Sequence, residues 1–304
     1  MSMKIGAFDL HEPVPELKEP HVFTLIRPWV DVGSAVTIAL SRLERHFAAK
    51  EMGRLARPGV FFDFTRYRPT IKLVEGRREV TIPNSFIHYA QPPGGPDFLF
   101  FHLLEPHAFG EDYTESVLEV FKYMGIKRYC RLGAMYDVMP HTRPLLVTGD
   151  TGRVPTRGNA GNLRRRQSTY QGPTTIMNLV SDGVPKLDPD IDVMNIMVHL
   201  PQYAQLEEDY TGAARLLEVL SSVYDLPPDL PPTQMGERQY RELAKAVERN
   251  TELKALIQRM EAQYDAEEAA RQAEEASPPA ALSPEVERFL QEMDRRFNNP
   301  DRPG

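Results

Sequence analysis

Up to Pro232, short apolar runs alternate with longer stretches of helical periodicity, and this alternation constrains the fold more than any other feature. Four apolar runs have the length and composition of buried strands: His21–Ile26, Asp97–Leu104, Arg128–Met135 and Asp192–Leu200. Three other stretches have apolar residues at helical spacing: Val32–Phe47, Tyr113–Met124 and Tyr210–Tyr224. Because strands and helices alternate along the chain, the sequence predicts an α/β body, a sheet covered by helices.

A group of short strands is expected between residues 60 and 89. Its members are Val60–Phe64, Thr70–Val74, Arg78–Ile82 and Phe86–Tyr89. Glu75-Gly76 has the composition of a hairpin turn, and Pro83-Asn84 interrupts the next connection. The pattern predicts a β-meander beside the main sheet or extending it. Asp31 precedes the first predicted helix and is expected to cap it.

The composition changes after Leu226–Pro232, which has four prolines in seven residues. Since proline lacks an amide donor and biases its predecessor away from helix, we place a domain boundary there. The prediction is an α/β core domain over residues 1–232 and a charged helical tail over 233–304, with a long helix over about 237–275 and a short one over about 284–297. One apolar stripe follows the long helix: Tyr240, Leu243, Val247, Leu256, Ile257, Met260 and Tyr264.

This stripe needs a partner, either the body or a second copy of the chain. We therefore expect a homo-oligomer or a protein partner bound through the helical tail. The net charge of −7 disfavours general nucleic-acid binding, because such binders need a basic surface. No apolar run is long enough for a membrane span. The single cysteine, Cys130, excludes an intrachain disulfide and fits a reducing compartment, so a cytoplasmic location is expected.

The ionisable residue of greatest interest is His141, in the segment from Asp137 to Pro144 that follows a predicted strand. Open α/β sheets place their sites in such loops, where Asp137 could orient the imidazole and Arg143 could receive an anion. A structural interpretation competes with this one and is favoured: the two prolines set a tight turn, His141 bonds to backbone and Arg143 pairs with Asp137. Glu105 and His107 follow another predicted strand and could lie at the same sheet edge, as ligands or an acid/base pair.

Other sequence signals of catalysis are missing. There is no Gly-x-Ser-x-Gly elbow and no Walker-type phosphate loop, and Cys130 lies within a predicted strand, where thiols are packed and inert. No cofactor and no metal site are expected, and an enzymatic activity is disfavoured without being excluded. Over residues 149–168 a loop carries five arginines, which could meet an acidic partner or remain solvated: Arg153, Arg157, Arg164, Arg165 and Arg166.

Four segments of the body resemble the proteasome assembly chaperone type 2 family. Arg27–Ala35, with Trp29, Asp31 and Gly33, is similar to the family's early strand-to-helix segment, commonly Gly-Trp-x-Asp-Ala-Gly. The second segment runs from Leu132 through Pro140-His141-Thr142-Arg143-Pro144 to Leu145 and looks like the family's Leu-Gly-Gly…Pro-His-Thr-Arg-Pro stretch. Gly172-Pro173-Thr174 is similar to its Gly-Pro-Thr-Gly-Ile element, and the Pro201–Tyr203 region is the fourth.

The resemblance implies a three-layer α/β/α core similar to the purine nucleoside phosphorylase type, here with a C-terminal helical extension. It implies homo-oligomers that act as assembly chaperones rather than established enzymes. Two departures count against proteasome assembly: Gln171 replaces the usual Glu, and Asp301–Gly304 lacks a hydrophobic-Tyr-x end. We expect a protein-interaction or assembly-chaperone-like protein; the alternative is an enzyme with a phosphorylase- or hydrolase-like fold acting near Asp137, His141 and Arg143.

Overall fold

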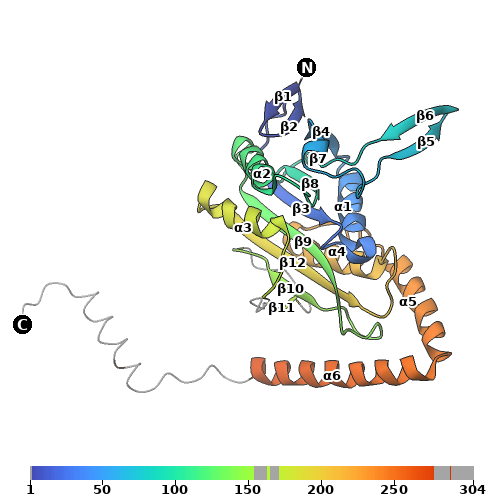
Figure 1. Ribbon diagram of the computed structural model, residues 1–304. Helices are drawn as coiled ribbons and strands as arrows, with labels where there is room; N and C mark the ends of the chain where they lie inside the picture. The colour runs from blue at the N-terminus through green and yellow to red at the C-terminus, as the bar shows by residue number, and fades with distance from the viewer. Residues whose placement is uncertain (1, 154–162, 165–170, 277–287, 289–304) are drawn as a thin grey trace, which may run out of the picture. The chain divides into compact units, whose positions relative to one another are not determined.

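The computed structural model describes residues 2–153, 163–164, 171–276 and 288. The chain divides into two compact units, Met1–Lys254 and Ala255–Gly304. The first unit contains a ten-stranded mixed sheet, in the order β1-β2-β4-β7-β8-β3-β9-β12-β10-β11 (Figure 1). Its strands are β1 (Ser2–Ile5), β2 (Phe8–His11), β3 (His21–Arg27), β4 (Lys50–Leu55), β7 (Phe86–Ala90), β8 (Phe98–Leu104), β9 (Arg128–Asp137), β10 (Val147–Asp150), β11 (Leu163–Arg164) and β12 (Asp192–Pro201).

The centre of the sheet consists of the four strands predicted from apolar runs. β3 pairs in parallel with both β8 and β9, and β9 pairs in parallel with β12. Strands β1, β2, β4 and β7 on one side and strand β10 on the other add antiparallel edges. Since parallel strands end at one edge, the residues after β3, β8 and β9 share the carboxyl edge of the sheet.

Helices cover both faces of the sheet. Helices α1 (Ala35–His46) and α4 (Tyr210–Tyr224) bury their apolar sides in one core, while α2 (Gly110–Met124) and α3 (Ile176–Leu187) bury theirs in the other. Along β3, Phe23 and Leu25 belong to the first core, whereas Val22 and Ile26 belong to the second. This alternation is the two-residue period of a strand buried on both faces. The predicted α/β body is confirmed; the resemblance to a phosphorylase fold stays a prediction.

The connection from β3 to α1 shows how local sequence positions a helix. A short 3₁₀ turn, η1 (Val32–Ser34), precedes α1. Oδ1 of Asp31 accepts hydrogen bonds from the amides of Val36 and Thr37, at 2.8 and 3.2 Å, so Asp31 caps this helix as predicted. Gly33 has a φ of +59° and its carbonyl accepts from the amide of Asp209. A Cβ at Gly33 would lie 2.9 Å from Cβ of Asp209, so this position favours glycine.

Between residues 57 and 90 the structure differs from the predicted meander. The strand expected at Val60–Phe64 is wrong: a 3₁₀ turn, η2 (Pro58–Val60), starts this segment, and Phe61 and Phe62 are buried in turn structure. Apolar character there reflects burial rather than extended backbone. β5 (Thr70–Val74) and β6 (Arg77–Thr81) form the expected hairpin but as a two-stranded sheet of their own, while β7 joins the main sheet.

The long helix expected over 237–275 is two helices, α5 (Thr233–Glu248) and α6 (Thr251–Ala276). Asn250 separates them, and its Oδ1 accepts hydrogen bonds from the amides of Glu252 and Leu253, as in a helix N-cap. Helix α5 belongs to the first compact unit. The predicted helix over 284–297, apart from Arg288, and most of the 149–168 loop lie outside the described residues. No helix in the described part of the chain has the length and apolar character needed to cross a membrane.

Candidate functional site

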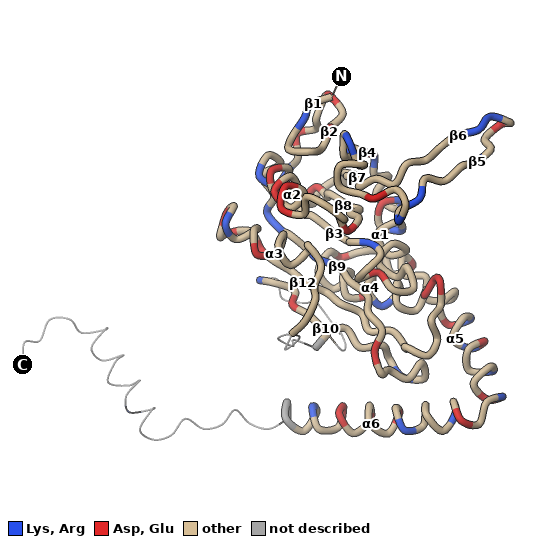
Figure 2. Tube along the Cα trace, in the orientation of Figure 1, with Lys and Arg blue, Asp and Glu red and all other residues tan. Residues whose placement is uncertain are grey.

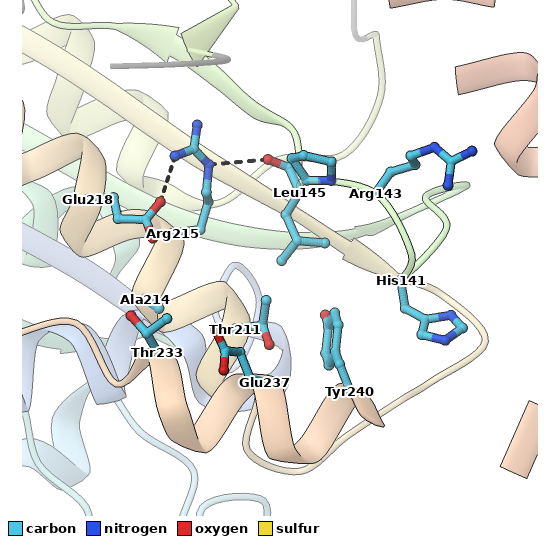
Figure 3. A pocket seen from close by; sticks show the side chains of 11 residues that line it. His141, Arg143, Leu145, Thr211, Ala214, Arg215, Glu218, Thr233, Glu237 and Tyr240 are labelled. Atoms are coloured by element: carbon cyan, nitrogen blue, oxygen red, sulfur yellow. Dashed lines mark hydrogen bonds and ion pairs between the residues drawn. The ribbon is translucent and has the colours of Figure 1, made fainter. Parts of the chain in front are cut away.

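A cavity of about 570 Å³ lies between the loop that follows β9 and helices α4 and α5 (Figure 3). His141, Arg143 and Leu145 line it from the loop. Arg215 on α4 contacts Oε2 of Glu218 at 2.7 Å and donates to the carbonyl of Leu145 at 3.4 Å. The structure thus brings His141 and Arg143 to one pocket, whose walls carry two arginines and the carboxylates of Glu218 and Glu237.

His141 is held in place by Tyr203. The hydroxyl oxygen of Tyr203 lies 2.7 Å from the backbone nitrogen of His141 and 2.6 Å from its Nδ1. One hydroxyl satisfies both groups when it accepts from the amide and donates its own hydrogen to Nδ1. The imidazole is buried, and the ring of Tyr240 lies edge-on at 6.1 Å between centroids. Two segments that carry the family resemblance, 140–144 and 201–203, therefore meet in space.

Tyr240 ties the pocket to the start of α4. Its hydroxyl donates to Oδ2 of Asp209 at 2.9 Å, while Oδ1 of Asp209 caps α4 through the amide of Gly212 at 2.8 Å. Burial raises the pKa of Asp209, and these hydrogen bonds only partly offset that effect. Since Asp209 also donates its amide to the carbonyl of Gly33, the Asp31–Gly33 turn and the pocket wall share one hydrogen-bonded unit.

Asp137 belongs to a different group of polar side chains, at the end of β9. Its Oδ2 lies 2.7 Å from Nδ1 of His199 on β12, and Nε2 of His199 lies 2.8 Å from Oγ1 of Thr148 on β10. Carboxylate, imidazole and hydroxyl thus follow one another in the order that activates a hydroxyl nucleophile in hydrolases. His199 is buried, and the register of three neighbouring strands sets the positions of all three residues.

Glu105 and His107 follow β8 but have separate local partners. Oε1 of Glu105 accepts from the amide of Ile176 at 3.0 Å, at the start of α3, while its Oε2 is buried with no hydrogen-bond partner among the described residues. Burial raises the pKa of Glu105. Nδ1 of His107 accepts from the amide of Asp63 at 3.2 Å, and its ring packs on Tyr67 at 4.5 Å between centroids.

The remaining motif residues lie at helix starts or at the surface. Trp29, the only tryptophan of the chain, is 66% exposed. Gly172, Pro173 and Thr174 are exposed and lead into α3, where Oγ1 of Thr174 accepts from the side-chain amide of Asn178. Thr142 and Pro144 are exposed parts of the His141 loop.

Several residues of these arrangements were not among the predicted site residues, His199, Tyr203 and Tyr240 being examples. His199 lies inside a predicted strand, one residue before its end, where an imidazole among apolar residues was the available signal. Tyr240 was expected on the apolar stripe of the tail, yet its hydroxyl serves the first unit. The pairing of β9 with β12 brings His199 to Asp137, and the position of α5 brings Tyr240 to His141.

The sequence profile of the PAC2 family matches residues 25–252, about three quarters of the chain. The chain belongs to the PAC2 family. The resemblance read from the Trp29, His141 and Gly172 segments is thereby confirmed. No curated protein matches the chain.

Solved structures share this PAC2 fold at low sequence identity. A protein of unknown function from Corynebacterium glutamicum is 21% identical, with 86% of this chain and 97% of that one covered and a TM-score of 0.74. One from Mycobacterium tuberculosis is 20% identical, with 90% and 93% covered and a TM-score of 0.74. A proteasome-assembly chaperone homologue, also from M. tuberculosis, is 23% identical, with 78% and 99% covered and a TM-score of 0.65. At these identities the likeness establishes the fold alone.

Proposed function

We propose that this PAC2 protein is an assembly-chaperone-like protein that works as a homo-oligomer, and that residues 70–82, here called the arm, make the contact between its copies. One observation carries the proposal: every residue of β5 and β6 is exposed. Ile71, Leu73 and Val80 are 52%, 77% and 59% exposed. Figure 1 shows the two strands projecting from the rest of the first unit.

The arm has one apolar face. In the register of the hairpin Ile71 is opposite Val80 and Leu73 is opposite Arg78, so Ile71, Leu73 and Val80 point to the same side. Lys72, Glu79 and Thr81 occupy the other side. An isolated two-stranded hairpin is marginally stable in water, and a cluster of exposed aliphatic side chains marks an interaction surface. A partner that covers this face would stabilise the arm.

We assign a second copy of the chain as the partner. The arm has three basic and two acidic residues and is preceded by Arg66 and Arg68, whereas the whole chain has a net charge of −7 (Figure 2). A basic arm is thus complementary to the acidic remainder of another copy. The M. tuberculosis protein of this fold is a proteasome-assembly chaperone homologue, which supports a chaperone-like role here.

Light scattering on the purified chain tests the proposal. We expect a mass of two or more copies for the wild type, and a single copy for Leu73→Asp, because a carboxylate would be buried in the contact. Thr81→Asp is the matched control: it adds the same charge on the other side of the arm and should weaken the association far less than Leu73→Asp does. A monomeric wild type, or an oligomeric Leu73→Asp variant, would contradict the assignment.

A second candidate function, hydrolysis, is favoured by the Asp137–His199–Thr148 chain of hydrogen bonds alone. Here His199 would take the proton of the Thr148 hydroxyl as that oxygen attacks an ester carbonyl, with Asp137 orienting the ring. The ester C–O bond breaks as His199 returns the proton to the departing alcohol, and water then hydrolyses the acyl–Thr148 ester to the carboxylic acid. The test is turnover of a simple aryl ester by the wild type and by Thr148→Val, which keeps the shape and removes the hydroxyl. Equal rates in both proteins, or none in either, would remove this candidate.

A further inference from the structure

Three side chains with metal-ligand chemistry meet on the sheet face covered by α1. Glu44 lies on α1, His88 on β7 and His102 on β8. Oε1 of Glu44 is 2.8 Å from Nδ1 of His88 and 2.6 Å from Nε2 of His102. All three ligand atoms lie within 4.8 Å of one another, and no other group of three such residues occurs in the described part of the chain. None of these residues belongs to the arrangements discussed above.

The fold fixes this cluster from two directions. β7 and β8 are antiparallel, with Phe86 opposite His102 and His88 opposite Phe100, so the two histidines are diagonal neighbours on one face. Phe100 on that face shares a core with Leu40 and Leu43 of α1, which places Glu44 over the pair of imidazoles. Groups held by paired strands and a packed helix keep their geometry better than groups on loops.

The cluster is shielded but still reached by solvent. The side chains of Glu44 and His102 are 14% and 12% exposed, and that of His88 is 29% exposed. A single ion pair would need only one imidazole, whereas here two point their nitrogens at the same oxygen.

We propose that Glu44, His88 and His102 form a binding site for a divalent transition-metal ion of the Zn²⁺ class. Two imidazoles and one carboxylate are the protein ligands of zinc sites that leave a fourth position for water. Mg²⁺ and Ca²⁺ prefer all-oxygen sites and are excluded by the nitrogen ligands. In tetrahedral geometry, ligands bound to one ion at about 2.0–2.2 Å lie roughly 3.3–3.6 Å apart. The two nitrogen–oxygen contacts would open by less than about 1 Å, which side-chain rotation supplies.

Isothermal titration calorimetry of the metal-stripped full chain with ZnCl₂ tests the site. We expect one Zn²⁺ per chain, and an affinity at least about tenfold lower in His88→Gln and in Glu44→Gln, since losing even a supporting residue of a metal site weakens binding 10- to 100-fold. His46→Gln is the matched control: this exposed histidine lies on the same helix as Glu44, and its loss should leave the affinity unchanged. MgCl₂ should give no binding signal.

Cobalt(II) provides a second readout that does not depend on comparing affinities. The wild type loaded with CoCl₂ should show the visible absorption of nitrogen-coordinated Co²⁺, and His88→Gln should lose it. Circular dichroism of the metal-free variants checks that they are folded; if His88→Gln is not, Glu44→Gln, which keeps the side-chain size, decides. A wild type without stoichiometric Zn²⁺ binding, or folded variants that bind Zn²⁺ as tightly as the wild type, would overturn the proposal.

Discussion

At the scale of single residues, the hydroxyl of Tyr203 is the partner of both polar groups of His141 that face it. We predict that His141→Ala and Tyr203→Phe each lower the free energy of unfolding by about 1 to 3 kcal/mol, because each removes a part-buried hydrogen bond between the hydroxyl and the imidazole. Arg143 is only partly buried, so Arg143→Ala should change stability little. Urea denaturation of the three variants measures these differences. Tyr123→Phe, at an exposed tyrosine, serves as the control.

Phosphate distinguishes this structural role from anion binding at the same loop. If His141 and Arg143 receive an anion, phosphate should raise the melting temperature of the wild type but not that of His141→Ala or Arg143→Ala. Without phosphate these two variants should then be as stable as the wild type. For His141 we expect instead that His141→Ala melts below the wild type and that phosphate leaves the melting temperature of the wild type unchanged. Thermal melts with and without phosphate decide between them.

His21 makes stability depend on pH. It lies between the rings of Phe98 and Tyr224, and burial, together with the charge of Arg128, lowers its pKa to about 4. The unfolded chain takes up a proton near pH 6.5, which the folded chain resists until about pH 4, so stability falls as the pH drops through this range. The loss should be on the order of 1–2 kcal/mol after screening by solvent.

The His21→Gln variant tests this assignment, because its side chain does not titrate. Its unfolding free energy should fall less than that of the wild type between pH 7 and pH 5 in urea denaturation. His46→Gln, at an exposed histidine, should keep the slope of the wild type. Parallel pH profiles of His21→Gln and wild type would assign the pH dependence to other groups.

At the scale of elements, sequence predicted those whose pattern is set by burial on both faces. Strands β3, β8, β9 and β12 were predicted because a strand buried on both faces is continuously apolar. Helix α4 was predicted because its buried side repeats apolar residues at helical spacing. β4, with the sequence Lys-Glu-Met-Gly-Arg-Leu, and α3, which contains Gly183 and Pro185, were missed. Gly183 is small because Leu118 packs against it, so tertiary contact overrides helix propensity there.

The position of α5 changes what a shortened chain should do. Besides the Tyr240 bond, the side-chain amide of Gln239 accepts from the amide of Tyr210 at 3.2 Å and donates to the carbonyl of Glu208 at 2.6 Å. We predict that a chain ending at Pro232 is destabilised by several kcal/mol relative to one ending at Lys254, since the buried carboxylate of Asp209 loses its partner and part of the α4 surface is uncovered. Melting curves of the two shortened chains measure this; equal stability would show that α5 contributes nothing to the first unit.

At the scale of the whole molecule, the sequence correctly predicted that the candidate residues follow the ends of strands. It could not predict which of their side chains meet. Asp137 pairs with His199, sixty-two positions later, through the register of β9 and β12. Glu44, His88 and His102 come together only because β7 folds back on β8 under α1. Such contacts depend on strand order and register, and apolar periodicity specifies neither between distant segments.

The last prediction distinguishes two ways in which copies of the chain could associate, through the arm or through the apolar stripe of the tail. A chain ending at Lys254 keeps the first compact unit with its arm and lacks the Leu256, Met260 and Tyr264 part of the stripe. If the arm makes the contact, light scattering should give the same number of copies for this chain as for the full one, and Leu73→Asp should dissociate both. If the tail stripe makes it, as the helical periodicity alone suggests, the shortened chain should be monomeric and Leu73→Asp should have no effect on the full chain. We expect the first outcome, because the aliphatic face of the arm is fully accessible to a partner, whereas Leu256 is the single large hydrophobic side chain of the described part of α6 that is strongly exposed.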